Sequence, residues 1–331
     1  MMPIKKFLMA MTLAAALTSC GNSTLNSFKI EGFALGTVYS VTVVGDSITD
    51  LQSKVDKIFA YADSTMSVFN PNSVLSRINR NESDRLDSNM VRNILLAQEI
   101  GQLSGGRYDI TVQPLVEAYG FLGSGAEHIN IDSLLEYVGY EKIAVSDGRL
   151  VKQAPQIRID LNSIAKGYVV DMIAGMLETE GIENYLVNVG GEIFCRGTNA
   201  NSTDWHIAID TPYEGNYLPG AATTTIIKVS GCGVATSGNY RNFRVADDGR
   251  KFTHIINPVT GANTESSLLS VTVIAESCAR ADALATMFMV MGLDESVAFL
   301  DSHDEIAALL IYDTPDNGMQ ILLSRSMKQF S

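Results

Sequence analysis

The sequence predicts an α+β fold built as one large unit. Residues with β-branched and aromatic alternation are grouped in long stretches, above all between residues 185 and 273, instead of alternating one by one with helices. The chain of 331 residues is 46% hydrophobic and 18% charged, which provides enough apolar material for a buried core. Its sequence contains no internal repeat, low-complexity tract or long linker that would divide it further.

The first half of the chain shows three of the expected elements. Residues 28–44 alternate as a pair of strands would, and we expect a helix after them with Thr49 as its cap. A second helix is expected from Asp87 to the glycine pair at 105–106. The apolar face of the first helix has helical spacing and consists of Leu51, Val55, Ile58, Phe59 and Ala62.

The second half of the chain completes the pattern. A helix is expected over about 162–180, and short strands with glycine and asparagine turns follow it. A strongly apolar helix is then expected over about 277–291, closed by Gly292, before a final strand over about 307–312.

The N-terminal segment has the composition of a lipoprotein leader. Two lysines precede an apolar run over 7–17 that is too short to span a bilayer as a stable helix. The run ends in Leu-Thr-Ser before Cys20, which resembles the bacterial lipobox; an ordinary secretory signal with a chance cysteine is the alternative. We expect a signal peptide over 1–19, a lipidated tether over 20–27 with membrane anchoring at Cys20, and one catalytic domain over 28–331.

The charge balance limits the classes of partner. With 24 Lys and Arg against 37 Asp and Glu, the formal charge is −13. An extended nucleic-acid surface is therefore not expected, because no basic footprint is available to displace counterions from a phosphate backbone. An anionic ligand would need a local cation or backbone N–H groups to offset the field of the protein.

Two oxygen-bearing residues share one face of the last expected helix. Asp282 and Thr286 are four residues apart, so their side chains project from the same side. A carboxylate and a hydroxyl in this position offer two hard oxygen ligands to Mg²⁺. The same residues would also suit a purely helical role, with the aspartate near the helix N-terminus and the threonine bonded back to a carbonyl.

A second candidate lies where an apolar run, which we expect to be a strand, ends in Asp160. A helix is expected to begin near Asn162 or Ser163, and the N–H groups of a helix start suit a phosphate. Lys166, one turn into that helix, could neutralise the phosphate charge. An ordinary helix cap with a surface lysine would explain the same residues.

Further candidates follow a helix end and an apolar strand. Tyr108 could stack on a planar ring and Asp109 could accept from ring or ribose donors, unless this segment is a turn into a buried strand. His254 is expected to end an apolar strand before a proline turn, where it could act as a general base toward a hydroxyl nucleophile or be a structural histidine.

Taken together and in order, these segments resemble the ApbE family of flavin transferases. The resemblance covers almost the whole mature chain, from Gly36 to about Gly292. The matching segments are Gly36–Tyr39, Met66–Phe69, Ser76–Asn79, Tyr108–Val112, Pro114–Val116, Asp160–Gly167, Gly190-Gly191, Thr236–Tyr240, His254–Gly261 and Asp282–Thr286.

The resemblance implies a specific reaction. Members of the family have a two-lobed, T-fold-like domain of mixed sheets and packed helices. They use FAD and Mg²⁺ to move FMN onto a Thr or Ser hydroxyl of an acceptor protein through a phosphoester bond, releasing AMP. The acceptors are flavin-carrying subunits of membrane redox complexes, such as Na⁺-translocating NADH:quinone reductase and Rnf-type systems, or other exported flavoproteins. Many members are lipoproteins that face the periplasm.

The resemblance also implies roles for individual residues. Asp282, Thr286 and Ser163 are expected to bind Mg²⁺, which makes Asp282 catalytic, and His254 is expected to assist deprotonation of the acceptor hydroxyl. The residues expected to contact FAD are Leu35, Phe69, Arg107, Tyr108, Asp109, Asp160, Lys166 and Ile255.

Three alternatives remain open at this stage. The same site could hydrolyse FAD to FMN and AMP, with water as the attacking group. Ser163 and Lys166 also match the S-x-x-K motif of penicillin-interacting enzymes, and Ser237 begins an S-x-N motif, but Val259 stands where a lysine would precede Thr-Gly. A flavin-binding lipoprotein with an inactive site is the third, which the presence of Asp160, Asp282 and Thr286 disfavours.

Overall fold

The structure is a computed structural model of the chain. It describes residues 25–46, 48–122, 130–213, 216, 222–239, 243–245, 251–253, 255–263 and 266–330. The expected signal peptide over 1–19, the lipidation site Cys20 and the candidate base His254 lie outside the described residues, so these remain predictions.

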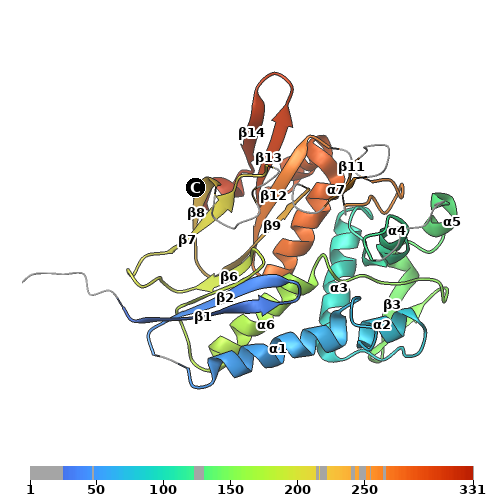
Figure 1. The fold of residues 1–331 in the computed structure, drawn as a ribbon. Helices are drawn as coiled ribbons and strands as arrows, with labels where there is room; N and C mark the ends of the chain where they lie inside the picture. Colours follow the sequence, from blue (N-terminus) through green and yellow to red (C-terminus); the bar gives the residue numbers. More distant parts are fainter. Residues whose placement is uncertain are drawn as a thin grey trace, which may run out of the picture.

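An antiparallel sheet of eight described strands forms one side of the molecule, in the order β1-β2-β5-β6-β9-β12-β13-β14 (Figure 1). The strands are β1 (Ser27–Ala34), β2 (Thr37–Val44), β5 (Tyr185–Val189), β6 (Glu192–Arg196), β9 (Cys232–Gly238), β12 (Leu268–Ala275), β13 (Ala307–Thr314) and β14 (Gly318–Leu323). Three two-stranded sheets accompany it, made by β3 (Ile143–Ser146) with β4 (Arg149–Lys152), β7 (Trp205–Asp210) with β8 (Thr223–Val229), and β10 (Phe243–Val245) with β11 (Lys251–Thr253).

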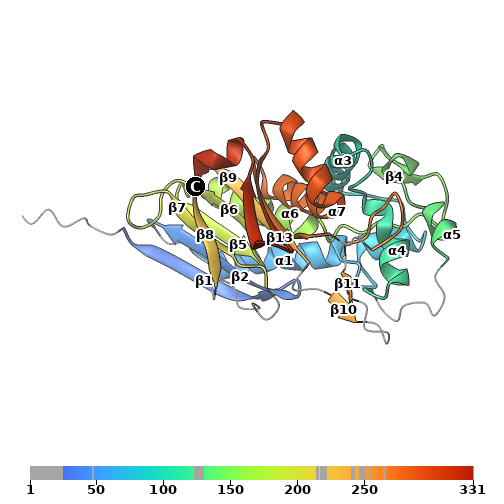
Figure 2. The same cartoon turned by 90° about the horizontal axis from the view of Figure 1, so that it is seen from above.

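Long helices cover one face of the sheet, and shorter helices form a second lobe at its end (Figures 1 and 2). The helices are α1 (Leu51–Met66), α2 (Val74–Asn79), α3 (Ser88–Leu103), α4 (Gln113–Ala118), α5 (Ile131–Leu135), α6 (Ala165–Thr179) and α7 (Cys278–Ser302). Helices α1, α6 and α7 lie along the sheet, whereas α2, α4, α5 and the β3–β4 hairpin gather beyond it. The arrangement is α+β, as the sequence predicts.

The two faces of the sheet bury different apolar sets. Val41, Val187 and Val271 face the long helices and pack with them in the main core. Residues of the opposite register, such as Ile193 and Leu309, pack under the β7–β8 hairpin in a separate cluster. This separation follows from the period-2 alternation of side chains along the strands.

Most of the long elements expected from periodicity are confirmed. The strand pair over 28–44 appears as β1 and β2, and α3 begins after Asp87, whose carboxylate accepts the N–H groups of Asn89 and Met90. Helix α7 begins after Ser277 and is interrupted at Gly292, where φ is 74°, before it continues to Ser302. Our prediction that Thr49 caps α1 is wrong, because Asp50 is the residue that directly precedes the helix.

Two expectations near the candidate site are also wrong: the start of helix α6 and the strand before Asp160. Helix α6 begins at Ala165, because residues 162–164 form a turn before it, so Lys166 is in the first turn of the helix. The apolar run that ends in Asp160 is not a strand; instead, the Asn79 side chain bonds both backbone groups of Ile159. The alternative given for the segment after Tyr108, a turn into a buried strand, is not found, because a short 3₁₀ helix there leads into α4.

Helices α6 and α7 approach each other closely at Gly167. Asp171 on α6 accepts the N–H groups of Cys278 and Ala279 at 2.7 and 2.9 Å and thereby caps α7. A Cβ atom added at Gly167 would lie 2.4 Å from the Cys278 carbonyl oxygen, which leaves no room for a side chain. The contact fixes Gly167, and with it Lys166, against the first turns of α7.

A glycine substitution tests this contact. Gly167→Ala is expected to lower the free energy of unfolding by about 1–3 kcal/mol or more, because backbone atoms and not a flexible side chain must move. Gly175→Ala in the same helix is the matched control; nothing lies within 4 Å of the added Cβ, so a slight stabilisation is expected. Urea unfolding of the two variants measures the difference, and equal stability would contradict the assigned packing.

Candidate active site

Asp282 lies in the second turn of α7 and is only 3% exposed. Its Oδ2 accepts the backbone N–H of Gly167 at 3.1 Å. Burial raises the pKa of Asp282 to about 7; the charge of Lys166 lowers this pKa and that of Glu192 raises it. A carboxylate held under these conditions is stabilised by a cation placed beside it.

Thr286 follows one turn later on the same face of α7, as the spacing predicts. Its hydroxyl lies 3.3 Å from the hydroxyl of Ser237 on β9, which the sequence analysis did not assign to this site. The adjacent Thr236 hydroxyl lies 2.8 Å from that of Thr272 on β12. Hydroxyl oxygens from a helix and a strand therefore lie next to each other where α7 packs on the sheet.

Ser163 contacts the second lobe through Tyr108. The Ser163 hydroxyl donates a hydrogen bond to the Tyr108 hydroxyl oxygen at 2.9 Å. Tyr108 is 2% exposed, and burial, with smaller contributions from the charges of Asp282, Asp160 and Asp109, raises the pKa of its phenol above the usual range. These interactions bring five of the predicted site residues into one electrostatic group.

Asp160 and Asp109 each organise the turn that follows them. Asp160 accepts the N–H of Asn162 at 2.8 Å, and Asp109 accepts both the N–H and the hydroxyl of Thr111 at 2.7 Å. The two segments are joined directly, since the N–H of Asp160 donates to the carbonyl of Ile110 at 2.7 Å. Burial raises the pKa of each carboxyl to about 6.

Lys166 forms an ion pair with Glu192, which the sequence analysis did not select. Burial alone would lower the pKa of Lys166, but the charges of Glu192 and Asp282 outweigh it and hold the pKa above its usual range. Glu192 is 3% exposed, and its Oε2 has no hydrogen-bond partner among the described residues. The only signal for Glu192 in the sequence is its position directly after the Gly190-Gly191 turn.

The donor set fits a magnesium ion better than a transition metal. Asp282, Thr286, Ser163 and Ser237 offer hard oxygens, the ligands that Mg²⁺ prefers. Within the described part of the chain, no group of three or more His, Cys, Asp or Glu is placed to hold a metal. An ion bound here would therefore complete its coordination with water and with phosphate oxygens of a substrate, as Mg²⁺ commonly does.

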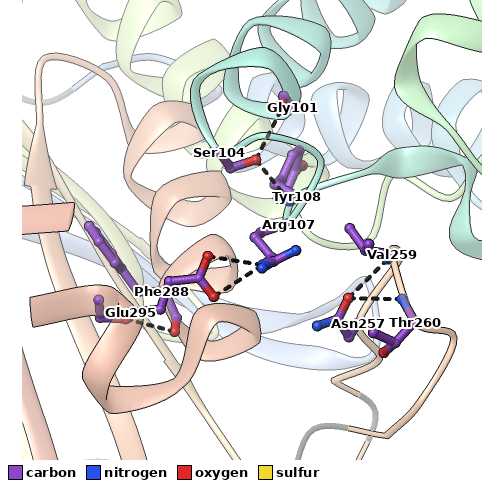
Figure 3. Close-up of polar contacts among 10 residues, drawn as sticks. Gly101, Ser104, Arg107, Tyr108, Asn257, Val259, Thr260, Phe288 and Glu295 are labelled. Carbon is purple, nitrogen blue, oxygen red and sulfur yellow. Dashed lines mark hydrogen bonds and ion pairs between the residues drawn. The ribbon is translucent and has the colours of Figure 1, made fainter. Parts of the chain in front are cut away.

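Four predicted FAD-contacting residues lie outside this network. Figure 3 shows Arg107 directed toward Glu295, to which its Nε donates at 3.0 and 3.1 Å. Leu35 begins the β1–β2 turn with a φ of 50°, and Phe69 is 69% exposed in the α1–α2 connection. Ile255 is buried in the main core. Their contact with FAD remains a prediction.

The turn after Ile255 is stabilised by the side chain of one of its residues, Asn257. Asn257 Oδ1 accepts the N–H groups of Val259 and Thr260 at 2.9 and 3.2 Å (Figure 3). The N–H of Gly261 closes the turn on the Asn257 carbonyl at 2.8 Å. This turn fixes the chain that directly follows position 254.

Three buried carboxyls predict the pH dependence of stability. The pKa values of Asp109, Asp160 and Asp171 are each raised by burial from 3.8 to about 6 in the folded protein. At pH values between the unfolded pKa and the folded pKa, the folded state binds more protons than the unfolded state. The free energy of unfolding therefore falls as the pH rises through this window. Each carboxyl contributes up to about 3 kcal/mol to this change.

The metal-free protein is therefore expected to be more stable at pH 5 than at pH 7.5. Urea unfolding over this range measures the slope, and Asp171→Asn is expected to flatten it because the amide does not titrate. Asp84→Asn is the surface control, since Asp84 is exposed and its pKa is lowered by its hydrogen bond to Arg149. Stability that rises steadily toward pH 7.5 would contradict the prediction.

Comparisons with known proteins show the family of this chain. The ApbE family model matches residues 35–310. The FAD:protein FMN transferase of Vibrio cholerae is 32% identical over 340 residues, covering 99% of each chain, and that of Salmonella typhimurium is 34% identical over 283 residues, covering 81% of this chain and 79% of the relative.

Solved structures show the same fold. The flavin transferase ApbE from Vibrio cholerae superposes with a TM-score of 0.82 at 32% identity, covering 93% of this chain and all of that one. The apo form of the Pseudomonas stutzeri flavinyl transferase ApbE gives 0.81 at 27% identity, covering 92% and 97%. The family match and the similarity along nearly the whole length together establish that the chain belongs to the ApbE family.

Proposed function

We propose that this protein transfers FMN from FAD to a Thr or Ser hydroxyl of an acceptor protein, with Mg²⁺ at Asp282 and Thr286. The relatives that match along most of the chain are named FAD:protein FMN transferases. The observation that carries the proposal is the buried Asp282 carboxylate, which lies near the Lys166 ammonium and one helical turn from the Thr286 hydroxyl. This combination suits a diphosphate in a protein of net negative charge.

The reaction exchanges the phosphoanhydride bond of the diphosphate for a new phosphoester bond. The acceptor oxygen forms a bond to the phosphorus of the FMN half, the diphosphate bond to that phosphorus breaks, and AMP leaves while the hydroxyl proton is transferred to a base. A bound Mg²⁺ would polarise the phosphoryl oxygens and offset their charge. We assign the phosphate contact to Lys166 and the proton transfer to His254, with Tyr108, Asp109 and Asp160 shaping the FAD pocket.

The alternative as a serine enzyme is not favoured by the geometry. A Ser-Lys nucleophile pair requires the lysine within hydrogen-bond reach of the serine. The Ser163 hydroxyl donates instead to Tyr108, and Lys166 pairs with Glu192. Hydrolysis of FAD uses the same site with water as the attacking group, so it is separated from transfer by experiment.

The experiment combines the mature chain with FAD, Mg²⁺ and an exported flavoprotein domain. Mass spectrometry is expected to show one FMN added to a Thr or Ser of the acceptor, with an equal amount of AMP released. Release of free FMN and AMP without a change in acceptor mass would instead establish the pyrophosphatase. If FAD is left intact in both assays, the proposed function is wrong.

We propose further that the mature protein is anchored by a lipid at Cys20 and faces the periplasm. Its acceptors would then be exported flavoproteins or the flavin-carrying subunits of membrane redox complexes of the Na⁺-translocating NADH:quinone reductase or Rnf type. The proposal rests on the leader sequence. Membrane fractionation tests it, because Cys20→Ser should move the protein out of the membrane fraction, and an unchanged distribution would contradict it.

A further inference from the structure

Glu192 is the buried charged residue of this site that the proposed reaction does not use. It follows the Gly190-Gly191 turn between β5 and β6, where φ is 69° and 108°. The turn is packed against β2, since the N–H of Gly190 donates to the Val38 carbonyl at 2.9 Å. A Cβ at Gly190 would lie 2.9 Å from the Thr37 side chain and 3.3 Å from Glu192 Oε2, so the turn leaves little room around the carboxylate.

Lys166 is near two carboxylates but pairs with only one of them. It forms its ion pair with Glu192, and the described residues include no ion pair between Lys166 and Asp282. The charge of Asp282 nevertheless acts on Lys166, and Asp282 is bonded to the very next residue, Gly167. The Lys166 ammonium is thus paired with Glu192 and also feels the charge of a second buried carboxylate, which is bonded to the backbone of the adjacent residue.

A lysine on Asp282 would compete with a divalent ion. A buried charge that loses its partner is costly, so it takes the nearest opposite charge. If the Glu192 charge were absent, that opposite charge would be Asp282, and the ammonium would occupy the carboxylate that the ion needs.

We propose that Glu192 is a positioning residue, whose carboxylate holds the Lys166 ammonium away from Asp282 and so leaves Asp282 free for the divalent ion. This inference rests on the proposed metal site of the transferase. It assigns Glu192 an effect on metal affinity and not on the chemical step. Positioning groups around a metal ligand typically change affinity by about 10- to 100-fold when they are substituted.

The test measures Mn²⁺ binding by electron paramagnetic resonance in the absence of FAD. Glu192→Gln keeps the shape and removes the charge, and it is expected to weaken Mn²⁺ binding roughly tenfold or more. Glu192→Asp keeps the charge and is expected to bind more tightly than the glutamine variant. The double variant Glu192→Gln, Lys166→Met removes the competing ammonium and is expected to return to near the parent affinity.

A second readout excludes a merely structural effect. In the FMN-transfer assay, the Mg²⁺ activation curve of Glu192→Gln should shift to higher concentration while the rate at saturating Mg²⁺ is largely retained. Lys166→Met alone should bind Mn²⁺ at least as tightly as the parent, which keeps the test valid if the glutamine variant does not fold.

Failure of the Glu192 role and failure of the proposed transferase function give different experimental results. Mn²⁺ affinity unchanged by Glu192→Gln, or a double variant as weak as the single one, would overturn the role of Glu192. Weaker binding by Lys166→Met, or no Mn²⁺ binding by the parent, would overturn it as well. If the parent and variants show the expected order of Mn²⁺ affinities but the parent transfers no FMN, the proposed function is wrong and the role of Glu192 is retained.

Discussion

Asp282→Asn is expected to slow FMN transfer severely while leaving the protein at least as stable as the parent. The amide retains an oxygen that can accept the Gly167 N–H, so the local contact between α6 and α7 is kept. It also removes a buried charge whose pKa is raised by burial, which favours the folded state in the absence of metal. The transfer rate is expected to fall roughly 10³-fold, because losing about 4 kcal/mol of charge stabilisation has this effect.

Two measurements on the same sample decide this prediction. Thermal unfolding without metal should give an equal or higher melting temperature for the variant, and the transfer assay at saturating Mg²⁺ should show the loss. Asp171→Asn is the control for the transfer assay alone, since Asp171 is also buried on the α6–α7 contact but accepts the backbone N–H groups of Cys278 and Ala279 with its two oxygens, one of which an amide cannot replace. Retention of the parent transfer rate in the Asp282 variant would refute the metal assignment.

The long elements of this fold are predictable because their periodicity extends over many residues. Helix α3 has both an apolar repeat and a capping aspartate, and α7 has an apolar face and an interrupting glycine. The segment ending in Asp160 has the alternation of a strand, yet the backbone of Ile159 pairs with the Asn79 side chain, 80 residues away. The Asn79 side chain makes the hydrogen bonds that a neighbouring strand would otherwise make. The local sequence pattern around Asp160 does not predict this contact.

The candidate site also contains residues that local spacing predicts and residues that only the tertiary packing brings together. The pair Asp282 and Thr286 is visible in the sequence, since helical spacing alone places the two on one face. Spacing does not place Glu192 and Ser237 beside them, because their positions depend on how β5, β6 and β9 pack beside α6 and α7. Ser163 is predicted as a site residue, but its contact with Tyr108 joins segments 55 residues apart.

Chelation of divalent ions is expected to stop FMN transfer completely and reversibly. Without a cation, the carboxylates of Asp282 and Glu192 outnumber the Lys166 ammonium in a buried site, and the diphosphate of FAD adds further negative charge. Like charges in a poorly solvated region repel strongly, so binding of FAD should weaken together with the chemical step. EDTA should therefore lower both the transfer rate and the affinity for FAD.

Restoration of activity identifies the kind of ion. Mg²⁺ and Mn²⁺ are both expected to restore transfer after EDTA is removed, because both suit octahedral oxygen ligands. Zn²⁺ is expected to restore it poorly, since none of the described site residues offers the thiolate or imidazole ligands that zinc prefers. FAD binding followed by flavin fluorescence, with and without EDTA, separates the two effects. Full transfer in EDTA would show that Lys166 and the backbone N–H groups suffice to hold the diphosphate, and the buried carboxylate at 282 would then need another explanation.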